Sequence, residues 1–201
     1  MGKVEVNKKK KEESLLNTAF ELFTSKGIND TSISDIVNKA GVAKGTFYLY
    51  FRDKYDIRNL LISHKSSQLF QSAHEAMLKE NITTMEDKIL FVMNHIIDDF
   101  VNDKKLLTFI SKNLSWGFFK KALINQENTN DVNFLEIYKS LINDSEKQIK
   151  EPELMLFMII ELVSSTCYNT ILYSDPVPLD TLRPYLNIAV LNIIKAHTVD
   201  D

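Results

Sequence analysis

The sequence predicts an all-α fold, because residues that interrupt helices are few. Only 5 Gly and 4 Pro occur in 201 residues, whereas an all-β chain of this length needs many turns built on them. The long stretches between these residues are rich in Leu, Ile, Lys, Glu and Asn, and several repeat apolar side chains at helical spacing. With 44% hydrophobic and 10% aromatic residues, the chain carries enough apolar surface for a packed core.

The first quarter of the chain predicts three helices in close succession. A helix over residues 8–26 ends before Gly27, and a second, short helix begins after Ser32, which with a following Asp resembles a capping box. A tight turn at Gly41 leads to a third helix over residues 43–51. Two helices joined by a short glycine turn predict a helix-turn-helix.

The remainder of the chain predicts further amphipathic helices. A polar loop is expected at residues 125–131, and a proline-containing break at residues 175–178. The predicted helices cover residues 54–79, 84–100, 104–123 with an interruption near residue 116, 132–149, 152–173 and about 181–197.

Charge is distributed unevenly along the chain. Residues 1–58 hold 11 Lys/Arg and 8 Asp/Glu, a balance of +3, whereas residues 59–201 have a balance of −6. This asymmetry favours a nucleic-acid contact in the first quarter. The basic run Lys8–Lys11 has two interpretations: an arm that contacts neighbouring phosphates, or the solvated start of a helix.

Several classes of site are not predicted. Cys167 is the single cysteine and the four histidines lack metal-ligand spacing, so we expect no disulfide, no metal and no cofactor. No nucleophile elbow, phosphate-binding glycine loop or carboxylate pair is present, which argues against an enzyme. No signal peptide is visible, and the apolar run 154–163 is too short to cross a membrane. The expected location is the cytoplasm, without membrane contact.

Residues 40–51 read Ala-Gly-Val-Ala-Lys-Gly-Thr-Phe-Tyr-Leu-Tyr-Phe and are followed by Asp53-Lys54. Together with Thr-Ser-Ile-Ser-Asp-Ile-Val at residues 31–37, this run resembles the tetracycline-repressor (TetR/AcrR) family of bacterial regulators. The resemblance covers about a quarter of the chain, Leu15–Leu61. It implies a helix-turn-helix DNA-binding domain over residues 1–53 and a helical ligand-binding and dimerisation domain over residues 54–201. Ala43 departs from the family, which commonly has serine there, and this removes a capping hydroxyl.

The third predicted helix has an outer face suited to DNA. If Phe47 and Phe51 face inward, Gly45 and Thr46 lie on the outer side near the start of the helix. Because both are small, they let the backbone approach a groove closely. Lys44 then contacts phosphate or a guanine edge, and Thr46 a thymine methyl group or base edge. Lys54 matches the family's phosphate-clamping lysine. The predicted DNA-binding residues are Ser32, Lys44, Gly45, Thr46, Tyr48, Leu49, Tyr50 and Lys54.

The second half contains large apolar side chains with a few polar ones among them, as a pocket for an apolar ligand requires. The candidate ligand-binding residues are Phe91, His95, Trp116, Phe119, Met158, Glu161, Tyr168 and Asn169. Each apolar member is also explained as a core residue. Glu161 either meets a cationic ligand or lies at a solvated edge or beside a lysine, and His95 either binds ligand or makes a structural hydrogen bond.

The last two predicted helices carry more apolar surface than a helix with one solvated side needs. Either they dimerise around a two-fold axis or they bury each other within one chain. The candidate interface residues are Phe157, Ile160, Ser164, Leu186, Val190 and Ile193. The predicted function is a ligand-responsive regulator, a repressor that binds a palindromic DNA operator as a homodimer and is released by a small, largely apolar effector. The alternative is an all-α carrier of lipids or small molecules without DNA binding.

Overall fold

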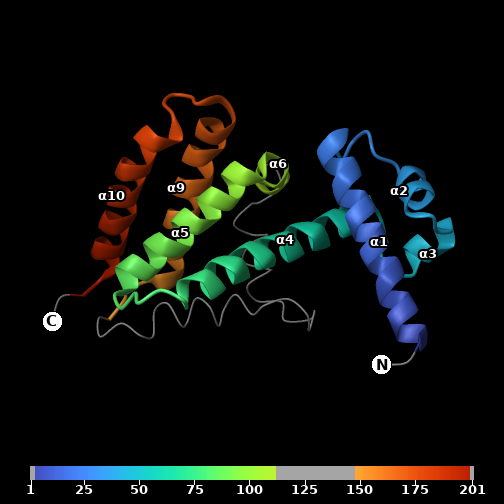
Figure 1. Ribbon diagram of the computed structural model, residues 1–201, viewed down its shortest axis with the longest axis horizontal. Helices are drawn as coiled ribbons and strands as arrows, with labels where there is room; N and C mark the ends of the chain where they lie inside the picture. Colours follow the sequence, from blue (N-terminus) through green and yellow to red (C-terminus); the bar gives the residue numbers. More distant parts are fainter. Residues whose placement is uncertain (1–2, 112–147, 200–201) are drawn as a thin grey trace. The chain divides into compact units, whose positions relative to one another are not determined.

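The computed structural model describes residues 3–111 and 148–199, and its regular elements in these ranges are helices (Figure 1). The prediction of an all-α fold is confirmed. Most of the predicted helix 132–149, the predicted loop 125–131 and the interruption near residue 116 lie outside the described residues. The helices are α1 (Lys3–Ser25), α2 (Ile33–Ala40), α3 (Lys44–Tyr48), α4 (Lys54–Met77), α5 (Met85–Asn102), α6 (Lys104–Ser111), α9 (Pro152–Tyr173) and α10 (Leu179–His197).

Contacts divide the chain into two compact units, residues 1–64 and 65–201, and the division falls within α4. The domain boundary expected between residues 53 and 54 stays a prediction. In the first unit α1 packs against α2, and α2 against α3. The buried apolar side chains of this unit are Leu15, Ala19, Phe23, Ile36, Val37, Phe47, Phe51, Ile57, Leu61 and Ile62.

A capping box begins α2, as the sequence predicts. The Ser32 hydroxyl accepts a hydrogen bond from the Asp35 N–H (3.1 Å), and the Asp35 carboxylate accepts one from the Ser32 N–H (2.9 Å). Lys26 donates to the same carboxylate at 2.8 Å. The Lys26 hydrogen bond, followed by those from Ser32, holds the pKa of Asp35 well below its usual range. The start of the helix-turn-helix is therefore fixed by polar contacts.

The turn between α2 and α3 depends on Gly41. Its φ of 68° and ψ of 32° are left-handed, a conformation that costs glycine little. The Val42 N–H donates to the Val37 carbonyl at 3.0 Å, which satisfies one of the last carbonyls of α2. The third helix, expected to reach residue 51, ends at Tyr48. There the Leu49 N–H donates to the Thr46 carbonyl oxygen (3.3 Å), three residues back instead of the four of an α-helix.

In the second unit α5, α9 and α10 lie side by side (Figure 1) and enclose the larger apolar core. Its buried residues are Met85, Met93, Ile97, Leu107, Met155, Ile159, Cys167, Ile171, Leu186, Val190 and Ile194. Arg183 of α10 ties this helix to α5, because it donates to Asn94 (2.9 Å) and Asp98 (2.5 Å). A smaller cluster contains Ala73, Met77 and Val92.

Helix α9 is 22 residues long and, by length and composition alone, apolar enough to cross a membrane. Core helices of soluble proteins share these properties. Met155, Ile159 and Cys167 of α9 are buried among side chains of α5 and α10. Burial also raises the pKa of the Cys167 thiol, as an inert core cysteine requires.

Candidate nucleic-acid interface

One face of α3 is open to solvent, and the opposite face is anchored in the core. Phe47 is fully buried, and its ring lies 5.4 Å from that of Phe51. Lys44 is exposed, Tyr48 is 53% exposed and Leu49 is 78% exposed. Lys44, Tyr48 and Leu49, which the sequence assigns to the outer face of this helix, are therefore all exposed.

Gly45 of α3 has no structural reason to lack a side chain. A Cβ atom added to it would meet no other atom within 4 Å, and glycine inside a helix costs about 1 kcal/mol relative to alanine. The missing side chain therefore leaves room outside the protein. We expect this composition of a backbone that approaches a DNA groove closely.

Tyr50, the second residue after α3, points its hydroxyl at α1. It donates a hydrogen bond to the carbonyl oxygen of Lys8 at 3.0 Å. The contact fixes the end of the α3 segment against the first turns of α1. Tyr50 therefore has a positioning role in the fold, in addition to the DNA contact that the sequence predicts for it.

Lys54 also has partners inside the protein. Its ammonium group donates to the carbonyl oxygens of Ile28 (2.9 Å), Asn29 (3.1 Å) and Thr31 (3.1 Å). An ammonium has three N–H donors, so these contacts use all of them. Lys54 joins the start of α4 to the loop before α2, and a phosphate would have to share or replace one of these carbonyls.

The remaining two predicted DNA-binding residues, Thr46 and Ser32, differ in exposure. Thr46 is partly buried. The Ser32 hydroxyl is exposed but takes part in the capping box, where it also donates to Asp35 at 2.8 Å. Ala43 at the N-cap of α3 offers no side-chain cap, in agreement with the departure noted in the sequence.

The comparisons with known proteins agree with this geometry. The family model of bacterial regulatory proteins of the tetR family matches residues 15–60. The HTH-type transcriptional regulator YvdT of Bacillus subtilis is 31% identical over 151 residues, which span 66% of this chain and 77% of that protein. The chain belongs to the tetR family of bacterial regulatory proteins. It is a DNA-binding transcriptional regulator with the helix-turn-helix at its N-terminus.

Two further similarities concern regulators of fatty acid metabolism. The fatty acid metabolism regulator protein of Bacillus subtilis is 34% identical over 88 residues, which span 44% of this chain and 45% of that protein. The crystal structure of the transcriptional regulator FadR from Bacillus subtilis in complex with stearoyl-CoA has a TM-score of 0.66 and 21% identity. The matched region covers 90% of this chain and 98% of the FadR chain. At this identity the structural likeness shows the fold alone.

The second unit of this TetR-family chain spreads the predicted ligand-binding residues over several places. Phe91 is partly buried and stacks on His95, their ring centroids 6.0 Å apart. Glu161 lies on the exposed side of α9, so its carboxylate keeps its contact with water. Met158 and Asn169 are also exposed, Tyr168 packs against the core, and Trp116 and Phe119 lie outside the described residues.

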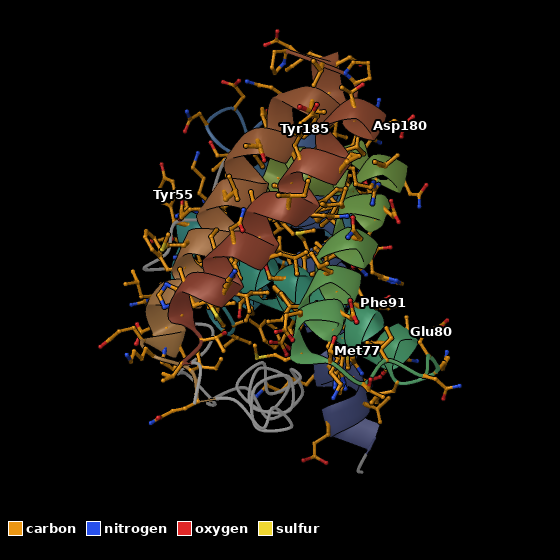
Figure 2. The ribbon with its side chains drawn as sticks, turned by 90° about the vertical axis from the view of Figure 1, so that its left-hand side faces the viewer. Tyr55, Met77, Glu80, Phe91, Asp180 and Tyr185 are labelled. Carbon is orange, nitrogen blue, oxygen red and sulfur yellow. The ribbon has the colours of Figure 1, made fainter. Side chains whose placement is uncertain are left out.

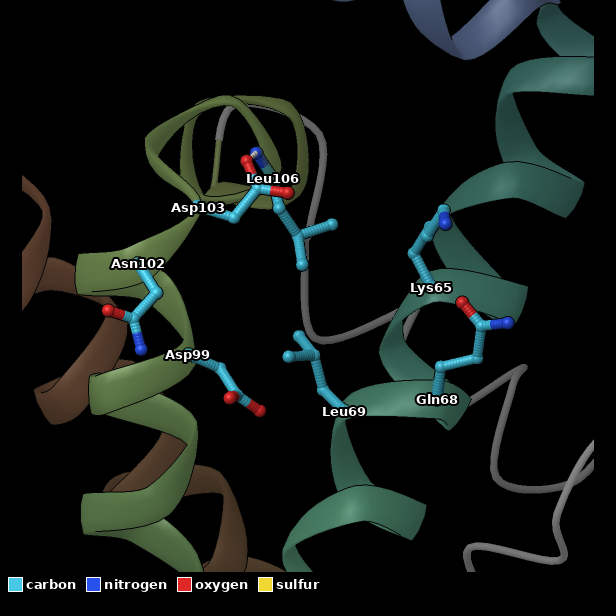
Figure 3. A pocket seen from close by; sticks show the side chains of 7 residues that line it. All are labelled: Lys65, Gln68, Leu69, Asp99, Asn102, Asp103 and Leu106. Carbon is cyan, nitrogen blue, oxygen red and sulfur yellow. Dashed lines mark hydrogen bonds between the residues drawn. The ribbon is translucent and has the colours of Figure 1, made fainter. Parts of the chain in front are cut away.

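A hollow of about 290 Å³ opens between α4, α5 and the start of α6 (Figure 3). None of the predicted ligand-binding residues lines it. Most of its lining residues are polar or charged in type, but apolar atoms make up the larger part of its surface. The lining residues are Lys65, Gln68, Leu69, Asp99, Asn102, Asp103 and Leu106.

The predicted interface residues of α10 are divided between the core and partly exposed positions. Leu186 and Val190 are 2% and 0% exposed within one chain, so neither has surface left for a second copy to cover. Ile193 and three residues of α9, Phe157, Ile160 and Ser164, are partly buried. The apolar side chains on the exposed side of α10 are instead Tyr185, Ile188 and Leu191. Tyr185, 72% exposed, is on the side of α10 that faces the viewer in Figure 2.

Proposed function

We propose that this TetR-family regulator is a cytoplasmic repressor that binds a palindromic operator as a homodimer. The open face of α3, with Gly45 at its start, carries the proposal. In this proposal Lys44 and Tyr48 contact phosphates, and Thr46 and Leu49 contact base edges. Lys54 and Tyr50 hold the helix-turn-helix in place. Two copies of α3 related by a two-fold axis then read two half-sites.

The proposed dimer uses the exposed apolar side of α10 together with that of α9. Tyr185, Ile188 and Leu191 are 72%, 57% and 36% exposed, and Leu154 and Met158 of α9 are 47% and 41% exposed. Large exposed apolar side chains on both helices support an interface there. A two-fold axis lets the same surface serve both chains. The proposed surface differs from the interface expected from the sequence, because Leu186 and Val190 are buried within one chain.

The proposed effector is small and largely apolar. Long acyl chains are apolar in this sense, and acyl-CoA thioesters, which join such a chain to the larger, polar and anionic coenzyme A, are the first class to test. The fatty acid metabolism regulator of Bacillus subtilis is a relative, and the FadR structure holds stearoyl-CoA. In the proposal the effector favours an arrangement of the two chains that no longer fits the operator, which is a shift between two populations. Direct titration of an acyl-CoA by calorimetry tests this part independently of DNA.

Selection of binding sequences from random duplexes, followed by gel-shift titration, tests DNA binding. The proposal expects a palindromic sequence to be selected. Replacing Tyr48 with Phe lowers affinity for all sequences, whereas Thr46→Ala changes the preferred base at one position in each half-site, by about 1–3 kcal/mol. If no duplex is bound even at low salt, the proposal is wrong and the alternative function, a small-molecule carrier, is favoured.

A further inference from the structure

The basic side chains of the N-terminal unit form two groups according to their partners. One group is neutralised or fully hydrogen-bonded inside the protein. It contains Lys26 with Asp35 (2.8 Å), Lys39 with Glu21 (2.8 Å), Arg52 with Asp56 (3.0 Å) and Lys54 with its three carbonyls. Arg58 belongs to neither group, because the oxygen that it contacts, that of the Asn59 amide (2.8 Å), is neutral. The second group, Lys8, Lys9, Lys10, Lys11 and Lys44, has no such partner among the side chains that the structure describes in this unit.

The unpartnered lysines lie at the two ends of the α3 segment. Lys44 is the first residue of α3. Lys8 lies at the other end, where its carbonyl oxygen accepts the Tyr50 hydrogen bond at 3.0 Å. All five side chains are exposed. The first turns of α1 are helical from Lys3 and extend beyond α3 (Figure 1). The four lysines of α1 form the Lys8–Lys11 patch; they point to different sides of the helix, and Lys8 and Lys11, three positions apart, share a face.

We propose that the Lys8–Lys11 patch contacts the phosphates of duplex DNA that flank the site entered by α3. Tyr50 is the positioning residue that holds the patch beside the recognition helix. This inference rests on the proposed function, and it decides between the two interpretations that the sequence leaves open for the basic run. Unpaired ammonium groups bind phosphates by releasing condensed counterions. Lysines already paired with carboxylates, such as Lys26 and Lys39, gain less by the same contact.

The test is fluorescence anisotropy of the full-length protein with a selected operator duplex, once with long flanks and once trimmed to the half-sites. The variant Lys8→Gln/Lys9→Gln/Lys10→Gln/Lys11→Gln is compared with a control that removes the same charge from the second unit. The control is Lys79→Gln/Lys104→Gln/Lys105→Gln/Lys195→Gln, at positions that are all exposed.

For the patch variant we expect weaker binding to the long-flank duplex, by about tenfold at low salt. The slope of log K against log salt should become shallower by about 0.9 for each phosphate that the variant no longer neutralises. Trimming the flanks should weaken wild-type binding and leave the patch variant unchanged. The preferred operator sequence should not change. Tyr50→Phe should show a smaller reduction of the same kind, confined to the long-flank duplex.

The inference is overturned if the wild type binds its operator while the patch variant and the control variant have equal salt slopes. It is also overturned if trimming the flanks weakens both proteins equally. Failure of the wild type to bind any duplex contradicts the proposed function itself, and the inference fails with it. Circular dichroism melting of each variant confirms that the substitutions leave the fold intact.

Discussion

The outer faces of α3 and α10 both expose large apolar side chains, but their neighbours differ. On α3, Tyr48 (53% exposed) and Leu49 (78%) stand beside the exposed Lys44 and Gly45. On α10, the exposed Ile188 (57%) instead has the exposed apolar side chains of Tyr185 and Leu191 one helical turn away on either side. Exposure of an apolar side chain alone therefore does not identify the partner. The charge and size of the neighbouring side chains on the same face help to identify the partner.

In the proposed function α3 meets DNA and α10 meets a second copy of the chain, and the difference between the two faces supports this division. A small residue and an unpaired cation favour a close approach to a phosphate backbone. A continuous apolar surface favours a dry interface of the kind that homodimers form. Four sets of variants can break or sharpen this division.

The largest effect is expected for Ile188→Glu. A carboxylate forced into an apolar interface without a partner costs several kcal/mol. Light scattering should show the mass of a single chain for the variant and the mass of two chains for the wild type. Operator affinity should fall by more than about a hundredfold, because each half-site is then bound separately.

Asn81→Glu adds the same charge at an exposed loop position and should leave mass and DNA affinity unchanged. A dimeric Ile188→Glu protein with wild-type operator binding would contradict the assignment of α10.

The next largest effect is expected for Leu186→Ala, two residues away on the same helix. Leu186 is buried in one chain, so its truncation removes core packing and should lower the free energy of unfolding by about 2–5 kcal/mol. Denaturant titration in the Ile188→Glu background measures this without a contribution from dimerisation. Unchanged stability would place Leu186 at an interface, as the sequence predicts, and would contradict the core position.

A third, smaller effect separates Lys54 from Lys44. Lys54→Met leaves three carbonyl oxygens without their donor, and hydrogen bonds to a charged group contribute about 1.5–3 kcal/mol. The variant should therefore be less stable before any DNA is added. Lys44→Met should keep the wild-type melting temperature and lose DNA affinity. Equal stability of the two variants would favour the phosphate-clamping role for Lys54.

The smallest effect is expected for Asp35→Asn, and it depends on pH. The pKa of the Asp35 carboxyl is lowered by Lys26 and Ser32, so its contribution to stability is complete above the ordinary aspartate pKa of about 3.9. It is lost as pH falls toward the lowered value. The difference in melting temperature between wild type and variant should therefore be constant from about pH 7 to 5 and shrink below about pH 4.

Asp30→Asn, at an exposed position nearby, is the matched control and should show no such difference. A difference that grows as the solution becomes more acidic would contradict the role of the charged carboxylate.

The α2–α3 segment could be predicted closely because local contacts determine it. The capping box of Ser32 and the left-handed Gly41 involve residues at most a few positions apart, and both were predicted and confirmed. The internal contacts of Lys54 and Tyr50 could not be predicted, because they join residues 23 to 42 positions apart. Nothing in the local sequence distinguishes a lysine that binds carbonyls from one that binds phosphate.

The sequence by itself determined the all-α class, the helix-turn-helix and its family, because caps, turns and helical periodicity are local properties. The tertiary structure decided which side of α10 is buried. It also showed which lysines are already paired, and that Tyr50, just after α3, bonds to the Lys8 carbonyl at the start of the basic run. Burial and pairing depend on side chains brought together from distant parts of the chain, and apolar residues on both sides of one helix look alike until a neighbouring helix covers one side.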